Sequence, residues 1–440
     1  MLNRICVLNI VGLTPAMMRH APNLSRLGTA TPIRGVLPAV TCTAQATMLT
    51  GAPPSEHGIV ANGWYYRDTA EIRLWQQNNA LVQSPLLYDD PELRSAGLTT
   101  AKMFWWFNQH ANVDYYATPK PHYGCDGSKV FGILDHTDCD LESHLGRFPF
   151  HTFWGPMAGI ACSDWIADAT ARVMRQQRPI MTLCYLPHLD YDLQRFDPSD
   201  PDVIIANVRQ VDAAAQRVIA AAHEIDAKVI VVSEYGLVPV HRPVMINRVL
   251  GDAGWLSVRD GPFGQQMMPG ECDAFAVADH QLAHVYVRDS GNRDAVQRLL
   301  ESTPGIASVV DPGELQLDHP RSGDLVAAAE PDAWFTYYFW DDDRNCPDYA
   351  RTVDIHRKPG YDPCELFMTS RVRAALRLLQ KKVGMRYRMD VIPLDPSRVR
   401  GSHGLHSTPQ DGPVFLSNAE IPPPDSLLDV RDCLKRIMMG

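Results

Sequence analysis

Short, almost wholly apolar segments constrain the fold of this chain more than any other feature. They cover residues 5–11, 180–186 and 228–233. Stretches with apolar residues at helical spacing, 163–176 and 201–225, precede the second and the third of them. Apolar runs of this length that alternate with helices are typical of parallel strands buried on both faces. The sequence therefore predicts an α/β fold with a mostly parallel central sheet flanked by helices.

A segment of different pattern interrupts this alternation. Between residues 239 and 351 short strands predominate, and loops and a basic helix follow. We expect a core formed by residues 1–238 and 352–440, with residues 239–351 as an inserted cap. The chain has 440 residues, and single cores usually stop growing at about 250–300 residues, so an added segment of this kind is reasonable.

Composition narrows the classes of function. The formal net charge of -10 at pH 7 argues against a nucleic-acid-binding protein, because such proteins carry a basic field. No run is long enough for a membrane span, and residues 5–11 lack the features of a signal peptide. Ten cysteines without a Cys-x-x-Cys pair suit free thiols in a reducing compartment. We therefore expect a cytoplasmic protein with a small-molecule partner, and the oligomeric state stays open.

One segment points to chemistry. A strand end and a Pro-marked turn lead into a helix rich in small residues that begins at Thr41 and stops at Gly51. This arrangement places a hydroxyl at a helix N-terminus, where backbone N–H groups and the helix dipole attract an anion. Taken alone, Thr41 is more simply a helix-capping residue, which is a common role for Thr.

The residues around Thr41 resemble the nucleophile segment of the type I phosphodiesterase and nucleotide pyrophosphatase branch of the alkaline phosphatase superfamily. In that family a Thr or Ser lies ten positions before the Gly of a Thr-Gly pair, as Thr41 lies before Gly51. A Pro-x-x-His-Gly-Ile-x-x-Asn motif follows, and this chain has it from Pro54 to Asn62. The resemblance implies an alkaline phosphatase-like core in which Thr41 is the nucleophile and Asn62 binds a phosphoryl oxygen.

The resemblance also implies divalent metal ions, and the ligands of the first ion are partly changed. Family members bind this ion through an Asp, a His four residues later and a His in a Gly-x-His-Gly motif. Asp190 and His403 match two of these positions, and Gln194 stands where the other His belongs.

The ligands of the second ion depart further from the family pattern. An N-terminal Asp becomes Val11, and an Asp-His pair becomes Glu234 and Tyr235, while the nucleophile oxygen is present at Thr41. Zinc clusters favour His nitrogen and carboxylate oxygen, whereas Mg or Mn accept amide oxygen as well. We therefore expect one divalent ion, Mg, Mn or Zn, rather than two.

Neighbouring residues are candidates for the missing roles. Asp192 lies close to Asp190, and His356 lies in a later block together with Arg357 and Lys358. Asp192 and His356 are chemically suited to a metal, and Arg357 and Lys358 to an anionic oxygen. Each is more commonly a polar residue of a loop or a strand edge.

These features predict a phosphoric ester hydrolase, namely a phosphodiesterase, pyrophosphatase or phosphatase, acting on a small phosphorylated molecule through Thr41 and a divalent metal. The alternative is a catalytically degenerate family member that binds a phosphorylated ligand or a partner without turnover. The changed metal ligands favour this alternative, and the presence of Thr41 and His403 opposes it. A sulfatase is excluded because residues 42–46 lack the Pro and Arg of the sulfatase motif.

Overall fold

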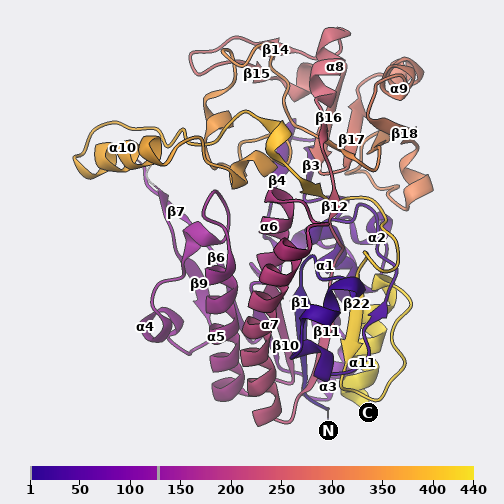
Figure 1. Cartoon of the computed structure of the whole chain (residues 1–440). Helices are drawn as coiled ribbons and strands as arrows, with labels where there is room; N and C mark the ends of the chain where they lie inside the picture. Colours follow the sequence, from indigo (N-terminus) through magenta and orange to yellow (C-terminus); the bar gives the residue numbers. More distant parts are fainter. Residues whose placement is uncertain (1, 126–128) are drawn as a thin grey trace.

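The structure is a computed structural model that describes residues 2–125 and 129–440. Within these residues the centre of the fold is an eight-stranded sheet with the order β2-β22-β11-β1-β10-β5-β6-β9 (Figure 1). Its strands are β1 (Ile5–Ile10), β2 (Thr31–Pro32), β5 (Thr100–Met103), β6 (Tyr115–Pro119), β9 (Ile133–His136), β10 (Met181–Leu186), β11 (Lys228–Val232) and β22 (Val414–Ser417). Strands β11, β1, β10, β5 and β6 run parallel, and β22 and β9 join them antiparallel. The predicted fold class is confirmed.

Helices cover both faces of this sheet. On one face α5 (Ile160–Gln177) packs against α7 (Pro201–Glu224), and on the other lie α1 (Thr41–Thr50) and α11 (Val430–Met439). Side chains of β1 alternate between the two cores, since successive residues of a strand point to opposite faces. Leu8 belongs to the core under α5 and α7, and Val7 to the core under α1 and α11. This explains why the strand is apolar at almost every position.

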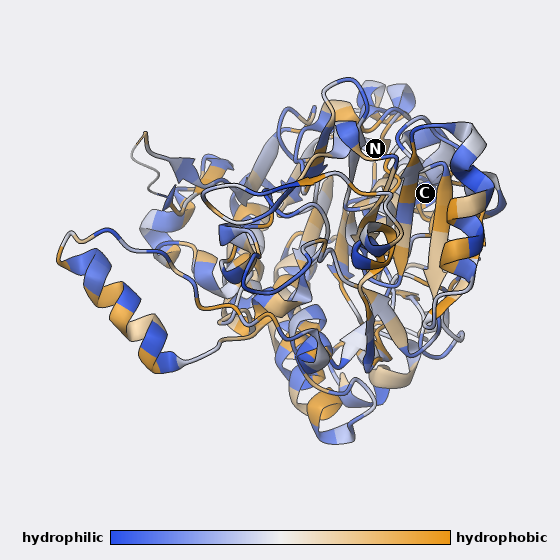
Figure 2. Ribbon diagram, turned by 90° about the horizontal axis from the view of Figure 1, so that it is seen from above, coloured by the Kyte–Doolittle hydropathy of each residue, from blue (hydrophilic) through white to orange (hydrophobic). Residues whose placement is uncertain are grey.

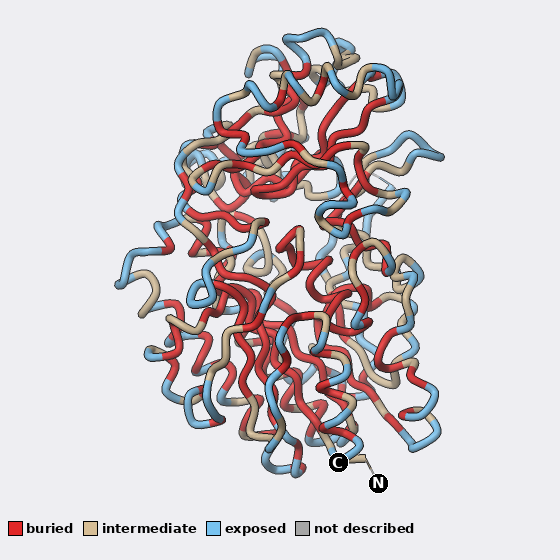
Figure 3. The backbone as a smooth tube through the Cα atoms, turned by 90° about the vertical axis from the view of Figure 1, so that its right-hand side faces the viewer, coloured by how far each residue is buried: buried red, intermediate tan, exposed pale blue. Residues whose placement is uncertain are grey.

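A second sheet, with the order β16-β17-β19-β18, lies above the carboxyl end of the parallel strands (Figure 1). Its strands are β16 (Ala274–Asp279), β17 (Leu282–Val287), β18 (Ile306–Val310) and β19 (Leu325–Ala329), and α8 (Ile246–Asp252) and α9 (Arg293–Glu301) pack on it. Figure 3 shows the two sheets as separate concentrations of buried backbone. The second sheet falls within residues 239–351, while the exact boundaries of a cap stay a prediction.

The short strand β20 (Ala333–Phe335) follows β19 closely in the sequence but pairs with β13 (Arg242–Val244). Strand β19 has β17 on one edge and β18 on the other, so neither edge is free for β20. The aromatic-rich residues 64–154 contribute β5, β6 and β9 to the main sheet.

The remaining elements are short. They are α2 (Pro54–His57), α3 (Pro91–Ser95), α4 (Leu141–Leu145), α6 (His188–Arg195), α10 (Arg371–Lys382), β3 (Gly63–Tyr66), β4 (Glu71–Leu74), β7 (His122–Tyr123), β8 (Lys129–Val130), β12 (Val238–Pro239), β14 (Val258–Arg259), β15 (Gln266–Met267) and β21 (Gly401–Ser402). The ten cysteines form no disulfide within the described residues. No helix in that part of the chain is long and apolar enough to cross a membrane.

Candidate active site

Helix α1 carries Thr41 as its first residue. Val40 precedes it in an extended conformation, and Gly51 ends the helix with a φ of 67°, a left-handed conformation that Gly adopts without strain. The Thr41 side chain is directed into the protein, because the residue is only 5% exposed. Its hydroxyl lies 3.0 Å from the hydroxyl of Tyr235. Thr41 is thus at the helix start and Gly51 at its end, as the sequence predicted, but the preceding strand, β2, ends at Pro32 and a loop leads from there to Thr41.

The residues at the first metal position form a hydrogen-bonded chain. Helix α6 follows β10 and carries Asp190 and Gln194 one turn apart. The Gln194 amide donates to Asp190 Oδ2 at 2.8 Å, and the Tyr361 hydroxyl donates to Gln194 Oε1 at 2.8 Å. His403 Nε2 lies 3.5 Å from Asp190 Oδ1, and Tyr235 donates to the same oxygen at 3.4 Å.

The residues at the second metal position are also hydrogen-bonded to each other. Glu234 follows β11, and its Oε1 accepts from Asn9 Nδ2 at 2.6 Å and from Gln45 Nε2 at 2.7 Å. Asn9 comes from β1 and Gln45 from α1. Gln45 Oε1 in turn accepts from the backbone N–H of Trp106 at 2.8 Å. Two side-chain amides thus donate hydrogen bonds to the carboxylate at a position where the family pattern has a metal ligand.

Burial dominates the electrostatics of these groups. It raises the pKa of Asp190 to about 7, although hydrogen bonds from Gln194 and Tyr235 act in the opposite direction. It raises the pKa of Glu234 to about 8, against hydrogen bonds from Gln45 and Asn9. It lowers the pKa of His403 to about 3. His403 Nδ1 lies 2.7 Å from the Ala39 carbonyl oxygen, which can only accept, so Nδ1 carries the proton and Nε2 is an acceptor.

Asn62 fixes the N-terminus of α1 to the second sheet. Its Oδ1 accepts from the backbone N–H of Cys42 at 3.0 Å. Its Nδ2 donates to Asp279 Oδ1 at 3.0 Å, and its backbone N–H donates to Asp279 Oδ2 at 2.7 Å. Burial raises the pKa of Asp279 to about 7. The sequence identified Asn62, whereas the pattern around Asp279 favoured a structural or capping role for that residue.

His280 and Tyr361 are further residues of the site that the sequence did not identify. The His280 ring stacks on the ring of Tyr361 at a centroid distance of 3.7 Å and lies 3.5 Å from that of His403. No local pattern predicts this, because the three residues come from distant parts of the chain.

The donor set does not fit the metal cluster of the family. Among residues 2–125 and 129–440, no group of three or more His, Cys, Asp or Glu could hold a metal ion. Asn9, Gln45 and Tyr235 present N–H and O–H donors at the carboxylates, and a donor competes with a cation for the same lone pair. Glu234 Oε2, His403 Nε2, Asn9 Oδ1 and His280 Nδ1 have no hydrogen-bond partner in this part of the chain. A zinc site takes three or four carboxylate, His or Cys ligands, and the described residues bring no such group together.

Asp192 and Lys358 form ion pairs instead of joining the hydrogen bonds around Thr41. Asp192 pairs with Arg195 at 2.6 Å. Lys358 is buried, and its Nζ lies 2.7 Å from Asp362 Oδ2 and 2.6 Å from Glu365 Oε1. Asp192 and Lys358 thus each have an ion-pair partner within the fold.

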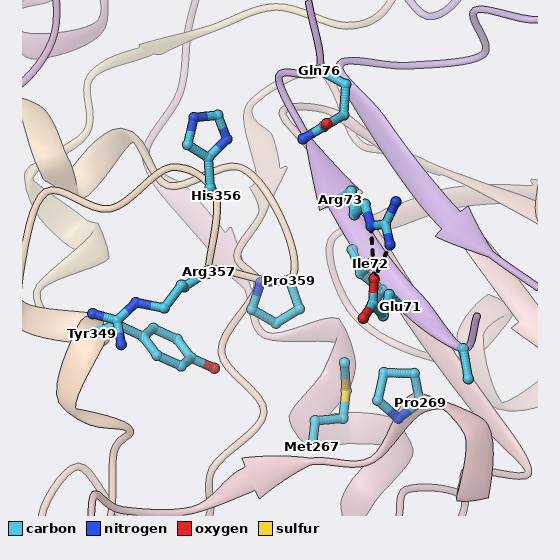
Figure 4. Close-up of a pocket in the computed structure, with 11 residues that line it drawn as sticks. Glu71, Ile72, Arg73, Gln76, Met267, Pro269, Tyr349, His356, Arg357 and Pro359 are labelled. Carbon is cyan, nitrogen blue, oxygen red and sulfur yellow. Dashed lines mark hydrogen bonds and ion pairs between the residues drawn. The ribbon is translucent and has the colours of Figure 1, made fainter. Parts of the chain in front are cut away.

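His356 and Arg357 line a surface pocket of about 520 Å³, whose wall includes neither Thr41 nor any of Asp190, Glu234 and His403. Figure 4 shows Arg73 paired with Glu71 on β4, across the pocket from His356 and Arg357. Arg357 itself pairs with Asp354 at 2.8 Å, and His356 Nδ1 lies 3.2 Å from the Leu74 carbonyl oxygen. The structure thus separates these two predicted residues from the residues around Thr41.

The chain belongs to the type I phosphodiesterase / nucleotide pyrophosphatase family, whose model matches residues 5–362. This membership places it among the phosphoric ester hydrolases and confirms the class predicted from the sequence.

Solved structures of the same fold include phosphonoacetate hydrolase from Sinorhizobium meliloti 1021 in complex with phosphonoformate. It is 16% identical, with a TM-score of 0.60, and the match covers 98% of this chain and 94% of that one. Murine ectonucleotide pyrophosphatase / phosphodiesterase 5 is 13% identical, with a TM-score of 0.58 and coverages of 99% and 95%. At these identities the likeness shows the fold alone. No curated protein matches the chain by sequence.

Proposed function

We propose that the chain hydrolyses a small phosphorylated molecule with Thr41 as the nucleophile. The observation that carries this proposal is the position of Thr41: it is the first residue of α1, beside the backbone N–H of Cys42 that Asn62 holds in place. Helix N-termini favour the negative charge of a phosphoryl group. The low exposure of Thr41 favours a small substrate over a polymer.

In the proposed reaction the Thr41 oxygen forms a bond to phosphorus as the bond to the leaving group breaks. Water then cleaves the phosphothreonine and releases phosphate. The hydroxyl proton of Thr41 has a hydrogen-bonded path through Tyr235 to Asp190, over 3.0 Å and 3.4 Å. Tyr235 thereby acts at a position where the family has a metal-binding His. Family members depend on metals in general, but no step is assigned to an ion here, since the donors do not fit one.

A specific observation favours the second candidate, a degenerate member that binds a phosphorylated ligand without turnover. The carboxylates of Asp190 and Glu234 already accept hydrogen bonds from Gln194, Asn9 and Gln45. A site completed by its own side chains has no structural need for a cation. We further propose a cytoplasmic location, supported by free cysteines that form no disulfide in the described residues.

Thr41→Val separates the two candidates, because valine keeps the shape of threonine and removes the hydroxyl. The purified chain and this variant are assayed with mono- and bis-nitrophenyl phosphate, after chelation and again with Mg, Mn or Zn added. Phosphate binding is followed by calorimetry, and thermal unfolding confirms that both proteins fold. We expect release of nitrophenol by the parent chain and its loss in Thr41→Val.

Full activity in Thr41→Val would refute the nucleophile assignment. An inactive parent chain that binds phosphate would establish the degenerate candidate. A parent chain that neither hydrolyses nor binds these compounds would contradict both. Elemental analysis of the untreated protein gives the metal content independently of activity. Two bound ions per chain would contradict the conclusion that the donor set does not fit the metal cluster of the family.

A further inference from the structure

Helix α10 (Arg371–Lys382) extends away from the rest of the molecule, as the two perpendicular views agree (Figures 1 and 2). None of its twelve residues, 371 to 382, is buried. Apolar residues are nevertheless frequent in it, and Figure 2 shows them alternating with hydrophilic ones along the helix. Helix α10 contributes none of the residues around Thr41, so the candidate active site does not account for its exposed apolar residues.

Four apolar residues of this segment form one continuous stripe. Val372, Leu376, Leu379 and Val383 follow each other at intervals of four, three and four residues, which places them on one face of a helix. Each is more than half exposed. Monomeric proteins rarely expose contiguous apolar patches of this kind unless the patch binds something. A stripe at this spacing normally lies against another apolar surface.

Positive charges are frequent beside the stripe. Residues 371–388 contain seven basic and no acidic residues, whereas the whole chain has a formal net charge of -10. Arg373 and Arg377 pair with Asp390, and Arg388 pairs with Asp348. The other four, which have no ion-pair partner among the described residues, are Arg371, Lys381, Lys382 and Arg386, and on a helical projection Arg371 and Lys382 border one side of the stripe. Met385 and Tyr387, both exposed, extend the apolar character beyond the helix.

We propose that residues 371–388 dock onto an anionic phospholipid surface, with the stripe facing the acyl chains and the basic residues at the headgroups. A basic amphipathic helix lies in the plane of a membrane in this way. Long Arg and Lys side chains at the border of the stripe reach the phosphates while their stems cover apolar surface. A helix of twelve residues is too short to span a bilayer, which takes about 20.

Charge favours lipid over a second copy of the chain. Two copies of α10 paired antiparallel along the stripe would place Arg371 and Lys382 of one copy beside Lys382 and Arg371 of the other. Like charges at such positions repel and destabilise the pair. An anionic surface instead attracts this segment, and the negative remainder of the chain turns away from it, so the charge distribution also sets the orientation.

The test is co-sedimentation of the full chain with vesicles of phosphatidylcholine alone or mixed with phosphatidylserine. We expect binding only to the mixed vesicles and weaker binding at high salt. Leu379→Ser should weaken binding by about tenfold or more, the factor expected when one leucine no longer buries its side chain. Leu378→Ser is the matched control: Leu378 and Leu379 are each 56% exposed, but Leu378 lies off the stripe, so binding should change little.

Three outcomes would overturn the proposal. The first is equal binding to both kinds of vesicle, and the second is equal loss in Leu378→Ser and Leu379→Ser. The third is a dimer in light scattering that Leu379→Ser dissociates, which would show that a second copy covers the stripe. Both leucines are solvent-exposed on an extended helix, so thermal unfolding should be unchanged in both variants. The nitrophenyl phosphate assay is independent of this test, because α10 contributes no residue to the proposed chemistry.

Discussion

Replacing Lys358 with methionine should destabilise the protein by about 3–5 kcal/mol, the cost of leaving buried charge without its partner. Lys358 is 1% exposed, and its single positive charge pairs with both Asp362 and Glu365. Burial alone would lower the pKa of Lys358, but the two carboxylates raise it to about 12, so the lysine is charged at neutral pH. Methionine approximates the volume of lysine, which keeps the contribution of a new cavity small.

The loss of stability in Lys358→Met should depend on pH, and the direction of this dependence can be worked out. Burial already raises the pKa of Glu365, and without Lys358, whose charge lowers it, this pKa rises further. The folded variant then holds protons that the unfolded chain has released, at any pH between the ordinary value near about 4 and the raised one. The stability of the variant therefore falls as pH rises through this window. The deficit relative to the parent chain should shrink as pH is lowered from 7 towards about 4.

The assay is urea unfolding followed by circular dichroism at several pH values. Arg344→Met is the matched control: Arg344 pairs with Asp342 at 2.8 Å but is 88% exposed, so its loss should leave the free energy of unfolding nearly unchanged. A deficit for Lys358→Met as small as that of the control would refute the reasoning. Unchanged stability together with weaker phosphate binding would instead support the role in substrate binding that the sequence suggested.

Two further predictions concern buried polar contacts and close packing. Burial lowers the pKa of Lys102 to about 7. Between about pH 7 and 10 the unfolded chain therefore keeps a proton on this lysine that the folded chain has released. The free energy of unfolding then increases as the pH rises. The stability of the parent chain relative to Lys102→Met should therefore increase from pH 7 to 9 in urea titrations, and a constant difference would contradict the assignment. Gly401→Ala should cost about 1–3 kcal/mol in thermal unfolding, since its Cβ would lie 1.9 Å from the Leu193 carbonyl oxygen. Gly251→Ala, which meets nothing within 4 Å, should not destabilise, and equal effects would refute the steric argument.

Local patterns predicted the parts of the fold that depend on neighbours in sequence. Apolar runs identified β1, β10 and β11, and helical spacing gave α7 to within a residue at its C-terminal end, because strand and helix periods are properties of the segment itself. Strands β5 and β6 were missed, since each has only four or five residues and lies between aromatic loops. Strand β5 takes its place in the sheet by pairing with β10, and β6 by pairing with β5, and no local pattern encodes these pairings.

The residues of the candidate site also divide into those that a local pattern predicts and those that only the fold brings together. Thr41 and Asn62 could be predicted because the nucleophile motif is a continuous segment. Gln45, Tyr361 and Asp279 could not, since they act only through contacts with residues far away in the sequence. Lys358 was predicted to meet a substrate because its charge is visible in the sequence, whereas its two carboxylate partners are visible only in the fold.

The departures from the family pattern at the metal positions are chemically connected. A carboxylate buried without a cation is costly unless it is protonated or accepts hydrogen bonds. Gln194 and Tyr235 stand where the family has two His ligands, and each donates to Asp190, while Asn9 and Gln45 donate to Glu234. The donors therefore satisfy carboxyl groups that an ion would otherwise neutralise. Restoring a single ligand, such as histidine at position 194, would remove a donor to Asp190 and leave the Tyr361 hydroxyl without its acceptor, so one substitution does not rebuild the ion site.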